Sequence, residues 1–376
     1  LLGYPDGTYD MLKQAETLAS ELNDDKTLAR VHLSMSYYHT FKGDISTGIS
    51  FAEKCFNEAE KISAADLMLQ SANPLCFAYS NRGDALKSSD ISRRALKQFE
   101  EHNLDKKLIL NGFYVFLGLA TMLGGSLAIL GQVEEAKKYL DEVVLNSGET
   151  NSMAHRISAL FYLAQISYFV GDGRNMLNHS LEMAGCCEKT EFRNFHGLAL
   201  AAMGVGYLLQ DENKKAREYA EKVLADLKVS GININTAWCN WFLSTILVED
   251  PDTLHLAEKC ALEALNYARG IGAKHLEAAA TVLHSFSIGK REPLRINEAL
   301  QAIRLGISMF KDMKLLPSTA MGYLFLGELQ SEYIHKEEAL ENLAIAESLF
   351  QELKQHKESY WISRIHRVLA NLHNKF

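Results

Sequence analysis

Several residue types are scarce in this chain, and each scarcity excludes a class of protein. The 376 residues include 5 prolines and 6 cysteines, no two cysteines have C-x-x-C spacing, and no secretory leader is recognisable. These features predict reduced thiols in a cytoplasmic protein rather than a disulfide framework. Acidic residues outnumber basic ones by 47 to 39, so the formal charge is −8. The broad basic surface that neutralises phosphates is therefore not expected, nor is direct binding to nucleic acid.

Motifs that carry catalysis or bind cofactors are also missing. The sequence has no P-loop of the form G-x-x-x-x-G-K-[ST], no H-E-x-x-H, no G-x-S-x-G and no EF-hand loop. We therefore expect no catalytic residue, no metal site and no cofactor. His32 and His39 are seven residues apart on one predicted helix, which puts their backbones roughly 10 Å apart, too far for one metal ion. The adjacent Cys186 and Cys187 side chains point about 100° apart on a helix, and a redox role would require their exposure.

The chain lacks strand-like alternation and hairpin signals, so no sheet is expected. Between Ile45 and Ala59, apolar and small residues instead recur in steps of three and four with charged residues between them. This periodicity is typical of an amphipathic helix and predicts an all-α fold. Asp44, Asp84 and Asp172 stand where a carboxylate can cap the following helix.

A repeat of about 40 residues runs through the whole sequence. It is defined by anchor positions at which an apolar stretch ends, often on glycine. The anchors are Gly3, Gly43, Gly83, Gly131, Gly171, Asp211, Asp252, Leu294 and Ile334. Small residues stand seven before and five after the anchors, with Met176 as the exception, and they allow close helix packing. Each repeat is thus predicted as a helix A, a turn and a helix B. One repeat is 48 residues long, and its surplus at 101–107 predicts a longer loop or an extra helical turn.

The repeat resembles a known family. A small residue in helix A, a glycine seven later and alanine five after that are similar to the tetratricopeptide repeat, although 40 residues exceed its usual 34. The segments 12–19, 43–44 and 131–136 resemble the C-terminal tetratricopeptide region of signal-transduction (STAND-type) ATPases, some of which carry a class III adenylate or guanylate cyclase. The resemblance implies an α-solenoid of about nine repeats of roughly 40 residues, forming a right-handed superhelix as a single array over 1–376.

The two ends of the array differ from its middle. The first repeat lacks most of its helix A, which predicts an exposed apolar edge including Leu12 and Leu18. The final helix, 357–374, is expected to cap the array. Its charged side chains are expected to face water; they are Lys357, Glu358, Arg364, Arg367 and Lys375. We expect the chain to be a fragment of a longer multidomain protein.

The segment 108–133 holds no charged residue and is long enough to span a bilayer. Gly124 and Gly131 nevertheless keep the repeat register within it. A helix A that is packed on both sides is also apolar all round, so we expect burial and no membrane partner.

The remaining prediction concerns binding. In arrays resembling this one, helix A lines the concave face. The predicted partner-binding residues there are Arg30, Tyr37, Asn73, Phe77, Phe161, Gln165 and Tyr168. Aromatic faces and amides suit a protein, an extended peptide or a small polar metabolite, whereas a merely solvated groove is the alternative. Trp238 and Trp241 are interpreted as packing between repeats.

These observations favour a non-catalytic scaffold or sensor module that regulates an upstream ATPase or cyclase by binding in the groove. One alternative is a stand-alone tetratricopeptide receptor for a peptide pheromone, or an adaptor. A second alternative is an enzyme on a helical-repeat scaffold, for which Glu328, His284 and Arg291 are the only ionisable set to nominate.

Overall fold

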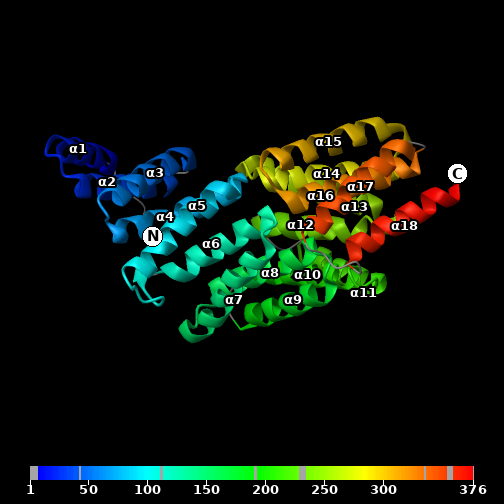
Figure 1. Cartoon of the computed structure of the whole chain (residues 1–376), viewed down its shortest axis with the longest axis horizontal. Helices are drawn as coiled ribbons and strands as arrows, with labels where there is room; N and C mark the ends of the chain where they lie inside the picture. Colours follow the sequence, from blue (N-terminus) through cyan, green and yellow to red (C-terminus); the bar gives the residue numbers. More distant parts are fainter. Residues whose placement is uncertain are drawn as a thin grey trace. The chain divides into compact units, whose positions relative to one another are not determined.

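The computed structural model describes residues 7–41, 44–110, 113–189, 193–227, 234–333, 336–353 and 359–375. The chain divides into two compact units, the first formed by 1–80 and 84–126 and the second by 81–83 and 127–376. Successive helices pack as antiparallel pairs in both units (Figure 1). The predicted all-α solenoid fold is confirmed.

The first unit begins with paired helices and ends in a buried one. Its elements are α1 (Thr8–Glu21), α2 (Asp25–Phe41), α3 (Ile45–Lys61), α4 (Ala65–Arg82), α5 (Ala85–Glu101), β1 (Ile109–Leu110), β2 (Phe113–Tyr114) and α6 (Val115–Leu130), of which α4 and α6 each run a few residues past the unit's limits. The strands β1 and β2 pair antiparallel over two residues each. This short hairpin lies in the long repeat, where the sequence predicted only a longer loop or an extra turn.

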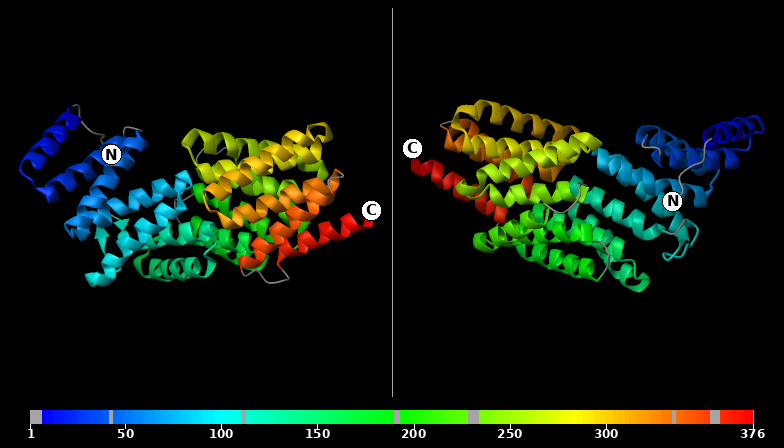
Figure 2. Two further views of the ribbon diagram at one scale, coloured as in Figure 1. Left: turned by 45° about the horizontal axis from the view of Figure 1, so that its top comes forward. Right: turned by 180° about the vertical axis from the view of Figure 1, so that it is seen from behind.

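The second unit continues the alternation of helix A and helix B to the C-terminus (Figure 2). Its elements are α7 (Val133–Thr150), α8 (Met153–Phe169), α9 (Gly173–Glu188), α10 (Arg193–Leu208), α11 (Asn213–Leu227), α12 (Ile234–Leu247), η1 (Pro251–Thr253), α13 (Leu254–Ile271), α14 (Lys274–Arg291), η2 (Pro293–Arg295), α15 (Ile296–Asp312), α16 (Leu316–Glu332), α17 (Lys336–Glu352) and α18 (Tyr360–Lys375). The predicted final helix, 357–374, corresponds to α18, whereas the predicted water-facing residues Lys357 and Glu358 lie outside the described residues.

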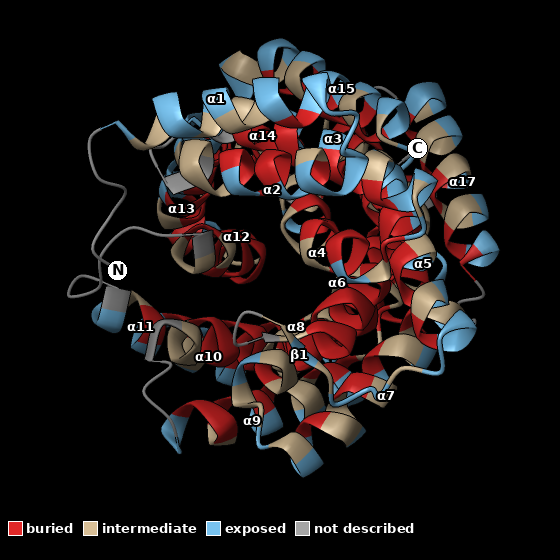
Figure 3. Ribbon diagram, turned by 90° about the vertical axis from the view of Figure 1, so that its left-hand side faces the viewer, coloured by how far each residue is buried: buried red, intermediate tan, exposed pale blue. Residues whose placement is uncertain are grey.

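Burial separates the two helix types of the second unit. The A helices α8, α14 and α16 are buried over most of their surface, whereas B helices such as α9, α15 and α17 carry one exposed stripe (Figure 3). The A helices also contact one another, since α10 packs on α12, α12 on α14 and α14 on α16. An A helix therefore has protein on several sides, which explains its nearly continuous apolar sequence.

The anchor positions are sharp turns. Gly83, Gly131, Gly171 and Asp211 have φ of 85°, 88°, 69° and 57°, the left-handed conformation typical of a helix C-terminus. At Asp252 and Leu294, where the glycine is missing, a short 3₁₀ helix beginning with proline replaces this turn. Gly3, Gly43 and Ile334 lie outside the described residues. The repeat is thus confirmed at six anchors, with two kinds of turn.

Helix caps and small residues agree with the predicted repeat. The side chains of Asp44, Asp84 and Asp172 accept hydrogen bonds from the backbone N–H groups of the third residue after each, confirming the three predicted caps. A side chain at Gly204, seven residues before an anchor, would lie 2.8 Å from Ile246. Small residues at this position therefore let neighbouring helices approach closely.

The described residues of the apolar segment 108–133 include β1, β2 and α6, and this helix is buried in protein: Leu117, Leu119 and Leu123 are fully inaccessible. Among the described residues, no helix has both the length and the apolarity needed to cross a membrane. At the other predicted edge, Leu18 is 57% exposed, whereas Leu12 packs partly on the small core of Val31, Met35 and Phe51.

Candidate functional site

Four of the predicted binding residues lie on A helices of the first unit. Arg30 and Tyr37 belong to α2 and Asn73 and Phe77 to α4. Arg30 is exposed, Tyr37 is half-buried, and Phe77 keeps 58% of its surface accessible. The amide of Asn73 lies over Gly118 of α6, where a Cβ would be 3.0 Å from the Asn73 nitrogen. The first unit therefore presents an exposed aromatic ring on an A helix, as a recognition surface requires.

The other three predicted residues lie on α8 in the second unit and are buried. Phe161, Gln165 and Tyr168 are 8%, 1% and 0% exposed. Phe161 packs edge-on against Trp238, and Tyr168 against Trp241, with ring centroids 5.7 and 5.1 Å apart. The packing role predicted for the two tryptophans is thus confirmed. Binding of a partner at the α8 residues stays a prediction, and it would require the residues that cover them to move.

Tyr168 is covered by the last helix of the chain. The indole Nε1 of Trp361 in α18 donates a hydrogen bond of 2.6 Å to the backbone oxygen of Tyr168, and the two rings meet edge-on at 5.2 Å. The next contact of α18 is made at Gly171, whose backbone oxygen accepts a bond of 3.3 Å from the Tyr360 N–H. Both carbonyls lie at or just beyond the C-terminus of α8, and that of Tyr168 also accepts the Gly171 N–H at 3.0 Å.

Arg364 of α18 is the centre of a buried ion network. Its guanidinium donates to both carboxylate oxygens of Glu328 at 2.8 and 3.1 Å, and to Glu249 at 2.6 Å. The ammonium of Lys290 lies 2.9 Å from the same Glu328 carboxylate. Arg364 is only 5% exposed, so the prediction that it faces water was wrong. Arg367, with half of its side chain exposed beside Asp211, does face water.

The network changes the ionisation of its members. Burial alone would raise the pKa of Glu328, but the charges of Arg364 and Lys290 outweigh it and lower that pKa to about 2. Burial would likewise lower the pKa of Arg364, and Glu249 and Glu328 instead raise it well above its ordinary value. Glu328 and Arg364 are therefore both charged at neutral pH. The network is stabilising only while the carboxylates of Glu249 and Glu328 stay paired with the Arg364 guanidinium.

Sequence reasoning missed Trp361 and Arg364 as functional candidates. The two are three residues apart, so they share one face of α18. The sequence feature that could have indicated their role is a tryptophan and an arginine at this spacing in the terminal helix. The sequence analysis placed Arg364 in solvent because the repeat period does not show which distant turns the terminal helix contacts.

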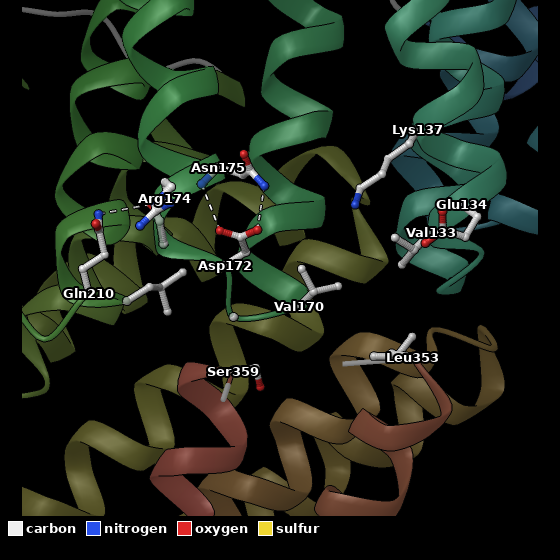
Figure 4. A pocket seen from close by; sticks show the side chains of 13 residues that line it. Val133, Glu134, Lys137, Val170, Asp172, Arg174, Asn175, Gln210, Leu353 and Ser359 are labelled. Atoms are coloured by element: carbon white, nitrogen blue, oxygen red, sulfur yellow. Dashed lines mark hydrogen bonds between the residues drawn. The ribbon is translucent and has the colours of Figure 1, made fainter. Parts of the chain in front are cut away.

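A polar pocket of about 670 Å³ adjoins α18 (Figure 4). Its walls come from the start of α7, from the turn between α8 and α9, from the end of α10, and from Leu353 and Ser359. Asp172 is held there by the backbone and amide nitrogens of Asn175, and Gln210 donates to the backbone oxygen of Gly173 at 3.3 Å. Lys137 and Arg174 also line it. The pocket has the size of a small-molecule site and a mixed charge.

The residues considered for metal or redox chemistry have structural partners. His32 lies between two carboxylates, with Nδ1 2.7 Å from Glu58 and Nε2 3.1 Å from Glu16. Cys186 and Cys187 are both buried, and burial raises the pKa of the Cys187 thiol to about 12. The exposure that a redox role would require is therefore lacking.

The residues nominated for catalysis also carry ion pairs. Glu328 is bound by Arg364 and Lys290, while Arg291 pairs with Glu258 and Glu292. Burial lowers the pKa of His284. Two of the three residues are therefore committed to separate ion pairs, and the nominated set gains no support as an acid and base pair.

Comparison with known proteins gives the fold. No family model matches the chain, and no curated protein matches it. Among solved structures, a Rap protein complexed with Competence and Sporulation Factor is similar with a TM-score of 0.60 and 12% sequence identity. The match covers 90% of this chain and 99% of the Rap chain. At this identity, the similarity supports a shared helical-repeat fold.

Proposed function

We propose that the chain is a non-catalytic helical-repeat scaffold that binds a protein or an extended peptide through its A helices. The observation that carries the proposal is the shared fold with a Rap protein that was solved with a bound factor, over nearly the full length of both chains. The exposed ring of Phe77 on α4, near Tyr37 in the predicted register, supplies a contact of the kind that dominates binding energy.

Binding to the A helices would also have a regulatory effect. By resemblance to the signalling ATPases, the array would regulate an ATPase or cyclase module of a longer cytoplasmic protein. A ligand does so only if it favours one curvature of the array over another. The stand-alone peptide receptor is the alternative, and reading the coding sequence before Leu1 separates the two: an ATPase or cyclase module there supports regulation, and a nearby start codon supports the receptor.

A selection experiment tests the binding surface. The full chain is used to select binders from a displayed peptide library, and their affinity is measured again for the double variant Tyr37→Ala, Phe77→Ala. We expect at least a tenfold loss, because truncating two aromatic contacts removes on the order of 2 kcal/mol or more. The matched control is Leu86→Ala, Leu262→Ala, which removes exposed apolar side chains from B helices. Equal affinity for the Tyr37 and Phe77 variant would remove this surface as the binding site.

The polar pocket favours a second candidate, a small polar metabolite. Lys137, Arg174, Asn175 and Gln210 line a volume that matches such ligands. A metabolite panel screened by thermal shift, with Lys137→Ala as the comparison, tests it. A compound that stabilises the parent chain and the variant equally does not bind in this pocket.

A further inference from the structure

The helix α18 lies on a surface built by four other helices and the turns beside them. This surface, called here the α18 dock, consists of Tyr168, Gly171, Glu249, Lys290, Phe325 and Glu328. These residues are spread over 160 positions of the sequence and come from α8, α12, α14 and α16 or the turns that follow them. The dock is therefore formed only when the second unit is folded.

The chemistry of the α18 dock selects its occupant. It offers the two backbone acceptors at the end of α8 and the carboxylates of Glu249 and Glu328, with Lys290 as its single cation. A helix C-terminus also carries partial negative charge. Without α18, these acceptors would lose the donors that the helix supplies and the dock would carry an excess of negative charge, so it requires a helix that brings a donor and a cation.

The helix α18 meets both requirements with one face. Trp361 provides the indole donor and is completely buried, and Arg364 provides a guanidinium that also lies over the Phe325 ring, 5.6 Å from its centroid. A spacing of three residues puts both on the same side of the helix. His366 and Arg367 are exposed, so the opposite side faces solvent. Two of the residues that bind Trp361 and Arg364, namely Tyr168 and Glu249, belong to distant repeats, so these contacts exceed the usual capping of the last helix pair.

We infer that the α18 dock is a binding site for an amphipathic helix, which α18 occupies within the same chain and which a partner helix can occupy in its place. The partner would carry an aromatic donor followed three residues later by arginine. This inference rests on the proposed function, because that function places Tyr168 on a partner-binding surface. It adds the class of partner, an amphipathic helix. An arginine is required because removing Arg364 leaves Glu328 buried with Lys290 alone, a strongly unfavourable state.

Covalent attachment makes α18 a strong competitor. A tethered helix acts at an effective concentration of the order of millimolar, so a free helix of equal intrinsic affinity is largely excluded. A free helix that binds the α18 dock weakly therefore cannot displace α18. Weakening the two anchors of α18 should open it.

The test uses α18 itself as the probe. A fluorescent synthetic peptide of residues 359–376 is titrated, with anisotropy detection, into the full chain and into the full-length double variant Trp361→Ala, Arg364→Ala. We expect the variant to bind the peptide at least tenfold more tightly than the unaltered chain. A peptide with the same two alanines should not bind the variant. The chain Arg367→Ala, altered at an exposed ion pair of α18, should behave as the unaltered chain.

The remaining outcomes decide against the inference. Equal binding to both chains, or absence of binding to a double variant that keeps its circular dichroism and its unfolding transition, would overturn it. Loss of the unfolding transition of α7–α17 would also overturn it, because α18 would then be part of an indivisible core. The milder variant Arg364→Met gives an independent readout: hydrogen exchange should accelerate in α18 while α8 and α16 keep their protection. Because no outside partner is used, a negative result leaves the peptide-selection test of the proposed function intact.

Discussion

At the scale of single residues, Gly171 meets two demands. Its φ of 69° disfavours any side chain, and a Cβ there would lie 3.0 Å from the Tyr360 nitrogen and 3.1 Å from the Trp361 ring. Gly272 has the same φ with no atom within 4 Å of such a Cβ. Alanine substitutions at Gly171 and Gly272 therefore distinguish the cost of backbone strain from the cost of a clash with α18.

The variant Gly272→Ala should lower the free energy of unfolding by about 1 kcal/mol, the strain of a left-handed alanine. Gly171→Ala should lower it by a further 1–3 kcal/mol or so, because the methyl group also displaces α18. Denaturant unfolding of both variants measures the difference. Equal losses would show that α18 yields to the methyl group without strain.

Glu328 makes stability depend on pH. Its pKa is about 2 in the folded chain, against an ordinary value of 4.5, so the unfolded chain takes up this proton at a higher pH than the folded chain does. The stabilisation is complete above about pH 5 and is lost as the pH falls towards 2, with a slope of up to about 1.4 kcal/mol per pH unit. Unfolding measured across this range should show a shallower slope for Glu328→Gln. The control Glu341→Gln, on an exposed position of α17, should keep the original slope, and an unchanged slope for Glu328→Gln would refute the assignment.

At the scale of helices, the start of α9 depends on one side chain. Asp172 accepts the Asn175 N–H at 3.0 Å, whereas Gln132 at the start of α7 makes no side-chain cap. We expect Asp172→Ala to lower stability by about 1 kcal/mol and Gln132→Ala to change it by only a few tenths. Chemical denaturation compares the two. A similar small effect for both would mean that water replaces the carboxylate without loss.

The helices also show what the sequence could predict. The three aspartate caps, the left-handed anchors and the small residues beside them were predictable because each is a local demand on one residue type. The hairpin of β1 and β2 was not, since strands of two residues each leave no alternation to detect. The burial of Arg364 was not predictable either. A buried arginine is stabilised by carboxylates 36 and 115 residues away, and no local pattern encodes that distance.

At the scale of the whole molecule, repeat arrays lose structure locally. Stability in such arrays comes from contacts between neighbouring repeats, so damage in one unit need not spread through the chain. Phe56 is buried in the first unit and Phe350 in the second. We expect Phe56→Ala, which removes on the order of 3–5 kcal/mol of packing, to increase hydrogen exchange in α1–α5 while α13–α17 stay protected.

The converse variant, Phe350→Ala, should expose α15–α18 first. Hydrogen exchange with peptide-level detection reads both patterns. Uniform loss of protection along the chain in either variant would show that the two units unfold as one.

The candidate site was only partly predictable at this scale. Helix periodicity assigned Phe77 and Tyr168 to equivalent faces of helix A, yet the first is exposed and the second has no accessible surface. Tyr168 is covered by Trp361 of α18 and by Trp241 of α12. Residues on the same predicted face of helix A therefore differ in exposure wherever a distant segment packs on that face.

The return of α18 to α8 also limits how the protein can change in length. An open array tolerates the gain or loss of a repeat, because each repeat touches only its neighbours. Here Trp361 must reach the end of α8 while Arg364 reaches the ends of α12 and α16. Inserting or deleting one repeat between α8 and α18 would move these targets by a full helix pair. The number of repeats in this part of the chain is therefore set by geometry, and natural variation in length should occur before α7.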